Sequence, residues 1–178
     1  ESSKIEEFKG DLLKIERFKN DFRGDVVFCC IGTTKAKTKD KEKYKAIDYG
    51  IPLSAAKLAK ENNINTIIII SALGANAKSS IFYNRTKGEM ERDVLAQEIA
   101  HTHILQPSLI TGNRNEQRRM EKIGASIFKV LGFLLIGPLK KYRAIEADSI
   151  AEAMINIDQR KPSEQIFESD KILSFNKS

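Results

Sequence analysis

Short, unbroken runs of apolar residues alternate along the chain with longer segments in which apolar residues recur every three or four positions. Apolar runs of this kind lie at residues 26–31 and 66–70, and a third candidate strand, His103 to Gln106, is stopped by Pro107. Runs of this length without polar alternation are typical of parallel strands that are covered on both faces. Helical periodicity lies between them, at residues 13–22, 44–62 and 83–99. This order predicts an α/β fold with a doubly wound parallel sheet and right-handed crossovers.

The two ends of the chain carry weaker patterns. Residues 5–8 could form a short strand, and two apolar segments near residues 123–135 and 148–157 predict further helices. We find no internal repeat and no linker, so residues 1–178 are expected to form one domain. Residues 112–178 would include a small lobe over the strand ends, on the substrate side.

Composition narrows the classes of protein. Hydrophobic residues make up 41% and charged residues 30% of the 178 residues, which excludes wholesale disorder. The 30 basic and 24 acidic residues give a formal charge of +6, which permits an anionic ligand without demanding one. Cys29 and Cys30 are adjacent, so neither a disulfide framework nor a metal site is expected. Without an apolar signal core or a membrane-length apolar run, we expect a cytoplasmic protein with no membrane partner.

Polar residues follow each predicted strand, where open parallel sheets bind their ligands. Glycine lets a backbone approach a ligand closely, and hydroxyl groups can bond phosphate or ribose. The residues at these three strand ends are Gly32, Thr33 and Thr34, then Ser71 to Gly74, then Gln106, Pro107 and Ser108. A plain strand-to-loop turn is the alternative interpretation of the glycine and the two threonines.

Tyr83 and Lys87 form the sharper candidate pair. They are four residues apart, so on a helix they share a face. A nearby ammonium stabilises phenolate and lowers the pKa of a tyrosine, which could then exchange a proton with a carbonyl or alcohol oxygen. Ser71, twelve residues before Tyr83, could hydrogen-bond the same oxygen. An ordinary surface pair of tyrosine and lysine is the alternative.

Residues 35–45 form a basic run in which lysine occupies every second position. It could steer a phosphate or a nucleic acid, but it contains one aromatic residue, Tyr44, and so lacks the interleaved aromatics that stack on bases. A solvated loop is the milder interpretation, and we expect no nucleic-acid partner.

Four segments together resemble the atypical short-chain dehydrogenase/reductases, close to the Tat-interacting-protein-like oxidoreductases. The resemblance covers most of residues 4–157 and implies a Rossmann-like fold. The segments that carry it, in the family's order, are residues 25–34, 70–76, 82–89 and 105–114.

This resemblance also implies roles for individual residues. Tyr83 would be the acid/base, Lys87 would hold the nicotinamide ribose, and Ser71 would polarise the substrate carbonyl. Asp48 lies where relatives often carry Asn or Asp. The implied cofactor is NADP or NAD, and NADP is favoured because relatives more often use it. The remaining implied contacts are with this cofactor. They are Asp11 and Leu12 toward the adenine, Gly32, Thr33 and Thr34 toward the ribose and phosphate, and Pro107 and Ser108 toward the nicotinamide amide.

The sequence departs from this family in two ways. No Gly-x-x-Gly-x-x-Gly motif occurs in it, so the chain is expected to lack the first two strands and the pyrophosphate-binding turn. Relatives often have two serines at the second strand end, whereas here Ala72 follows Ser71.

The leading hypothesis is an NAD(P)-dependent oxidoreductase that acts on a small-molecule carbonyl or alcohol. A non-catalytic NAD(P)-sensing or protein-interaction module on the same fold is the rival, because a fold does not fix an activity. The apolar stretch at residues 127–139 could pack over the substrate cleft or form a dimer helix, so a homodimer stays open.

Overall fold

The computed structural model describes residues 4–112 and 135–176, and its centre is a parallel sheet of four strands in the order β1-β2-β3-β6. The strands are β1 (Val26–Cys29), β2 (Thr66–Ile70), β3 (His101–Gln106) and β6 (Ile166–Glu168). β2 is an inner strand, in register with β1 from Val26↔Thr66 to Cys29↔Ile69 and with β3 from Thr66↔His101 to Ile70↔Leu105. β6 extends the sheet beyond β3.

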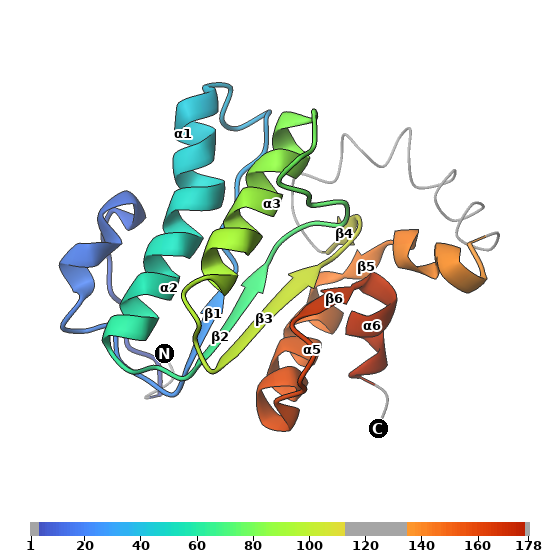
Figure 1. The fold of residues 1–178 in the computed structure, drawn as a ribbon. Coiled ribbons are helices and arrows are strands. Elements are labelled where there is room, and N and C mark those ends of the chain that lie inside the picture. The colour runs from blue at the N-terminus through green and yellow to red at the C-terminus, as the bar shows by residue number, and fades with distance from the viewer. Residues whose placement is uncertain (1–3, 113–134, 177–178) are drawn as a thin grey trace.

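Helices cover both faces of this sheet (Figure 1). On one face lie α2 (Ile51–Glu61) and α3 (Phe82–Leu95), and on the other lie α5 (Ala147–Arg160) and α6 (Ser169–Ser174). Ile67 and Ile69 pack with the first pair, whereas Ile68 packs with the second, since successive strand residues point to opposite faces. This explains why the strand is apolar without alternation and confirms the doubly wound parallel sheet.

The helix expected at residues 44–62 is present but composite. It begins earlier, as α1 (Lys41–Lys45), continues through the wide π-helical turn η2 (Ala46–Gly50), and ends as α2. The expected helix at 83–99 is α3, which ends four residues sooner, and the helix expected near 148–157 is α5.

The N-terminal expectations are partly wrong. Residues 5–8 form no strand; Ile5 is 76% exposed, and this segment has no neighbouring strand with which to pair. The segment at 13–22 is a 3₁₀ helix, η1 (Leu12–Phe18), followed by a turn. Ile15 and Phe22 nevertheless pack against α2, as the periodicity predicted.

The C-terminal third contributes more to the sheet than a separate lobe would. Besides β6 and its two helices, it supplies η4 (Gly137–Tyr142) and β5 (Ile145–Glu146), which pairs in parallel with β4 (Ile110–Thr111). The helix expected near 123–135 lies almost wholly outside the described residues. Within the described ranges, no helix is long and apolar enough to cross a membrane.

Candidate functional site

A buried ion pair joins η2 to α3 at the carboxyl end of β1. The Nζ atom of Lys87 lies 3.1 Å from Oδ1 of Asp48, and the two side chains are 5% and 1% exposed. The second carboxylate oxygen of Asp48 accepts a hydrogen bond from the backbone N–H of Thr33 at 2.8 Å. The wide turn of η2 places this acidic residue on the inner side of an otherwise regular helix, and π-helical turns often occur at functional sites.

The helical face predicted for Tyr83 and Lys87 is real, and it continues one turn further to Glu91. Lys87 and Glu91 are both buried, whereas Tyr83, in the first turn of α3, is 41% exposed. Burial raises the pKa of Tyr83, and the nearby carboxylate of Asp48 raises it further. The expected lowering by Lys87 is therefore wrong for this structure, because Asp48 takes up the positive charge of that lysine.

Thr33 and its neighbours form a rigid corner after β1. The Thr33 hydroxyl shares a 2.9 Å hydrogen bond with the hydroxyl of Thr38, and its carbonyl accepts one from the phenol of Tyr44 at 3.3 Å. Thr34 begins the next turn, where its carbonyl accepts from Thr38 N at 2.9 Å. Gly32 lies so close to the ion pair that an added Cβ would be 3.4 Å from Asp48 Oδ1 and 3.8 Å from Lys87 Nζ.

Ser71 lies at the end of β2, as predicted, beside a buried carboxyl that the sequence analysis missed. Gln106 Nε2 donates to both carboxylate oxygens of Glu91 at 2.9 Å. The Ser71 hydroxyl is buried and makes no hydrogen bond of regular geometry to any described residue. Burial raises the pKa of Glu91, while Ser71, Gln106 and then Lys87 each act to lower it. Ser71 thus lies close enough to Glu91 to lower the pKa of its carboxyl group.

Pro107 and Ser108 follow β3 and are held by the surrounding backbone. The carbonyl of Pro107 accepts a hydrogen bond from Leu73 N at 2.9 Å, which ties the ends of β2 and β3 together. Ser108 donates its N–H to the hydroxyl oxygen of Ser169 at 2.7 Å and its hydroxyl to the carbonyl of Arg143. The Ser108 hydroxyl is therefore already used within the fold.

Asp11 and Leu12 lie apart from this cluster. The Asp11 carboxylate caps η1 by accepting from Leu13 N at 3.0 Å. Leu12 lines a shallow hollow of about 240 Å³ between η1 and the helix formed by η2 and α2. No hydrogen bond or ion pair between described residues connects Asp11 with Thr33 or Lys87, so the structure does not bring the adenine-side candidates to the buried ion pair.

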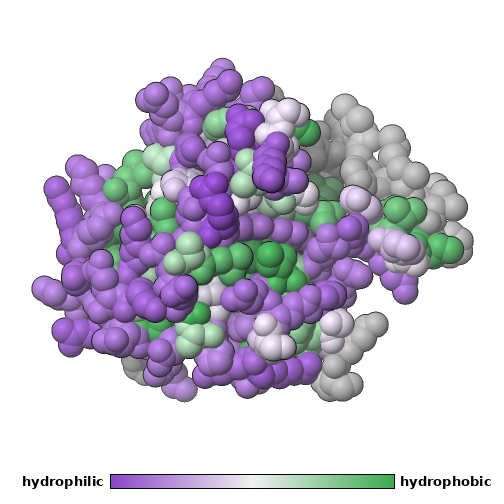
Figure 2. Space-filling model, in the orientation of Figure 1, coloured by the Kyte–Doolittle hydropathy of each residue, from purple (hydrophilic) through white to green (hydrophobic). Residues whose placement is uncertain are grey.

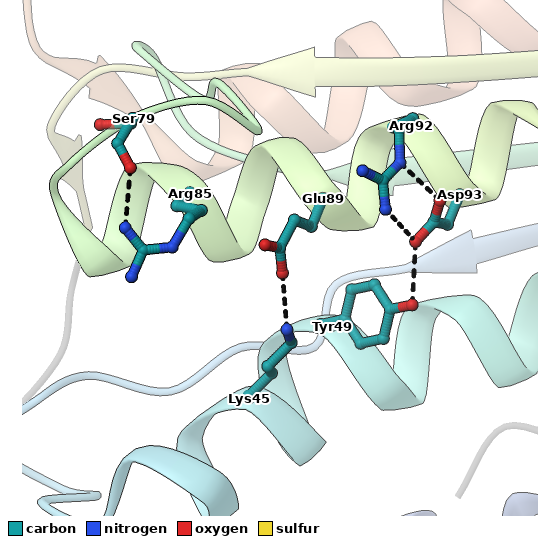
Figure 3. A network of polar contacts seen from close by, with 7 residues as sticks. All are labelled: Lys45, Tyr49, Ser79, Arg85, Glu89, Arg92 and Asp93. Atoms are coloured by element: carbon teal, nitrogen blue, oxygen red, sulfur yellow. Dashed lines mark hydrogen bonds and ion pairs between the residues drawn. The ribbon is translucent and has the colours of Figure 1, made fainter.

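A second set of polar contacts fixes the two helices that carry the ion pair (Figure 3). Lys45 pairs with Glu89 at 2.6 Å, and the phenol of Tyr49 donates to Asp93 at 2.9 Å. These contacts join α1 and η2 to α3 on both sides of Asp48. They lie beside the ion pair and do not contact the Asp48 carboxylate, which is bound by Lys87 and by Thr33 N.

Two residues of the site, Tyr44 and Glu91, were not singled out from the sequence. Glu91 could have been found, because it follows Tyr83 and Lys87 at the same four-residue interval on one helical face. Tyr44 carried no such signal, since it lies in a run of lysines. Its phenol is buried against the Phe82 ring, with ring centroids 5.6 Å apart. Among the described residues, no cluster of histidine, cysteine and acidic side chains could hold a metal ion.

Solved structures with the same fold include two that were determined in complex with a nicotinamide dinucleotide. One is RMD from Pseudomonas aeruginosa complexed with NADPH, with a TM-score of 0.65, 13% identity, and coverage of 89% of this chain and 65% of that one. Another is UDP-glucuronic acid 4-epimerase from Bacillus cereus in complex with NAD, with a TM-score of 0.62, 14% identity, and coverage of 88% and 57%. At this level of identity the likeness shows a Rossmann-like α/β fold, as the sequence predicted.

Sequence relatives correct two expectations. Protein FMP52, mitochondrial, from Candida albicans is 37% identical over 138 residues, or 76% of this chain and 59% of the relative. The chain thus spans less than two thirds of that relative's length. Because FMP52 proteins of several fungi are named mitochondrial, the expectation of a cytoplasmic protein is wrong. The finer likeness to Tat-interacting-protein-like oxidoreductases is replaced as well, since the matching family model, over residues 9–133, is HIM1. That match includes the ion pair and both strand ends beside it, and the chain belongs to the HIM1 family.

Proposed function

We propose that this protein is an NAD(P)-dependent oxidoreductase that reduces a carbonyl group. The observation that carries the proposal is the position of Lys87, buried at the end of β1 and bound to Asp48, which also holds the backbone of Thr33. A lysine fixed at a strand end, with a tyrosine one helical turn away, presents two polar groups to any ligand at the carboxyl edge of the sheet.

The residues present fit the nicotinamide half of a dinucleotide. Gly32 leaves the backbone open beside the Lys87 ammonium, and the buried Ser71 hydroxyl still lacks a regular hydrogen-bond partner. Lys87 and Thr33 would hold the ribose, with Pro107 near the carboxamide. When bound, the nicotinamide supplies the hydride. The glycine-rich turn that would hold the pyrophosphate does not occur in this sequence. The choice between NADP and NAD stays open, as do the roles of Asp11 and Leu12.

Tyr83 is in the protonated form that carbonyl reduction requires of a proton donor. Its pKa lies above the ordinary tyrosine value because of burial and the Asp48 carboxylate. A neutral phenol can donate its proton to the carbonyl oxygen as that oxygen gains negative charge, with Ser71 as a second donor. The second candidate is a non-catalytic NAD(P)-sensing module on the same fold. The pairing of Lys87 with Asp48 favours it, because the positive charge of that lysine is then taken up by the carboxylate rather than by the Tyr83 phenol.

The comparison of Tyr83→Phe with Tyr49→Phe tests the proposal. Tyr49 is a matched control because its phenol binds Asp93 on the outer side of the same helix. The binding of NADPH and NADH is measured, together with the oxidation of the cofactor that depends on an added carbonyl compound. Both measurements are made in this chain and in a longer chain, in which this sequence is extended to the full length of its relatives. Tyr83→Phe should retain cofactor binding and lose about 100-fold or more of turnover, whereas Tyr49→Phe should retain both.

Three outcomes decide between the candidates. Turnover that survives in Tyr83→Phe overturns the catalytic role of that tyrosine. Cofactor binding without turnover of any aldehyde or ketone in the longer chain supports the sensing module. Absence of cofactor binding from the longer chain overturns both.

The names of the relatives support a mitochondrial location, which fractionation of cells that express the protein would test.

A further inference from the structure

The positive charge of this protein is concentrated in two segments. Residues 33–45 and 76–89 contain nine basic and three acidic residues. The rest of the chain contains 21 of each kind, from totals of 30 and 24, so these two segments account for the whole formal charge of +6. The basic residues are Lys35, Lys37, Lys39, Lys41, Lys43, Lys45, Lys78, Arg85 and Lys87.

The two segments meet at the start of α3, on either side of Tyr83. The Nζ atom of Lys41 lies 5.7 Å from the centre of the Phe82 ring, which also packs against Tyr44. Further along α3, Lys45 of the first segment pairs with Glu89 of the second at 2.6 Å. Both segments lie at the end of the molecule where β1 and β2 finish (Figure 1), and hydrophilic residues dominate the surface there (Figure 2).

Two of the three acidic residues of these segments are engaged within the segments themselves, by groups other than Lys35, Lys39 and Lys41. Asp40 caps α1 by accepting from Lys43 N at 2.7 Å, and Glu89 pairs with Lys45 at 2.6 Å. No ion pair between described residues neutralises the exposed side chains of Lys35 and Lys39, and Lys41 contacts only an aromatic ring. A group of unpaired ammonium ions around a strand-end site attracts anions and raises their local concentration.

From this distribution we infer that the substrate of the site carries a negatively charged group, a carboxylate or a phosphate. Lys35, Lys39 and Lys41 attract this group, while the carbonyl of the substrate lies at Tyr83. The inference rests on the proposed function and names its substrate class. Two other anions could account for the lysines, namely the 2′-phosphate of NADP and the backbone of a nucleic acid, and the experiment separates them.

The test uses two aldehydes that differ in one charge, 4-formylbenzoate and its methyl ester. Their binding to the cofactor-loaded protein is measured by equilibrium dialysis, which requires no turnover, at low and at high salt. The test variant is Lys35→Gln/Lys39→Gln/Lys41→Gln. The matched control, Lys14→Gln/Lys57→Gln/Lys161→Gln, removes three exposed lysines on η1, on α2 and after α5.

The anionic aldehyde should bind about tenfold more tightly than the ester, and the test variant and high salt should each abolish this advantage, while the control preserves it. Equal binding of the two aldehydes overturns the inference. The inference is also overturned if the test variant weakens the binding of NADPH relative to that of NADH, or the binding of duplex DNA, but leaves the binding of 4-formylbenzoate unchanged. Tight binding of 4-formylbenzoate without its reduction overturns the proposed catalysis and leaves the anion site standing.

Discussion

Lys87 and Asp48 form a buried ion pair, 3.1 Å between Nζ and Oδ1, that connects α3, the π-helical turn η2 and, through Thr33, the end of β1. The two charges are nearly inaccessible to water, so each depends on the other for solvation. Removal of one partner leaves an uncompensated charge in the interior, which costs far more than the intact pair contributes.

This dependence predicts strong coupling between the two residues. Lys87→Met and Asp48→Asn should each lower the free energy of unfolding by about 3–5 kcal/mol. The double variant should lose clearly less than the sum, because it leaves no unpaired charge. Denaturant unfolding of the four proteins measures the coupling. Additive losses would mean that the two side chains do not solvate each other.

Gly88 allows the loop after β2 to pack directly on α3. An added Cβ would lie 2.2 Å from Ala77 N and from the carbonyl carbon of Asn76, both of which are backbone atoms. Gly88→Ala should therefore destabilise the fold by about 1–3 kcal/mol and displace the first turn of α3, which carries Tyr83. Gly50→Ala is the control, since its Cβ approaches nothing closer than 4.0 Å and alanine favours a helix. Thermal unfolding should rank Gly50→Ala at or above the parent and Gly88→Ala well below it.

Glu91 should make stability depend on pH in the direction opposite to that of a surface carboxylate. Burial raises its pKa, so its contribution to stability is fully present below the unfolded-state pKa and is lost as pH rises through the folded value. Glu91→Gln should therefore gain stability relative to the parent as the pH rises above the ordinary glutamate pKa of about 4. Gln106→Leu removes the donor of both hydrogen bonds, so its loss should grow over the same interval. Losses independent of pH would show that Glu91 does not titrate there.

The sequence was sufficient for most of the sheet because β1 and β2 lie in apolar runs and β3 ends directly before Pro107. β6 could not be predicted in this way. It has three residues, Ile166 to Glu168, and its position depends on pairing with β3 about sixty residues earlier. The strand predicted at residues 5–8 does not form, although the segment contains apolar residues. Among the described residues no strand pairs with it, and Ile5 stays exposed.

The candidate site was predicted where the chemistry follows from local spacing and missed where it depends on packing. Tyr83 and Lys87 share a helical face, as their spacing requires, and Ser71 ends its strand. The predicted direction of the Tyr83 pKa shift was wrong because that shift depends first on burial and then on Asp48, a residue that the π-helical turn η2 directs inward. No four-residue interval reveals a contact of that kind.

The pKa of Tyr83 should fall when the charge of Asp48 is removed. Asp48→Asn eliminates the carboxylate that raises it and frees the Lys87 ammonium to stabilise phenolate. Titration of phenolate absorbance, with the contribution of Tyr83 obtained by subtracting the curve of a Tyr83→Phe background, measures the shift. Asp93→Asn is the matched control, because Asp93 raises the pKa of Tyr49 instead, and that variant should move only the Tyr49 step. If reduction requires the neutral phenol, the alkaline limit of carbonyl reduction should move to lower pH in Asp48→Asn and stay in place in Asp93→Asn. An unmoved Tyr83 titration in Asp48→Asn would show that burial alone sets its proton affinity.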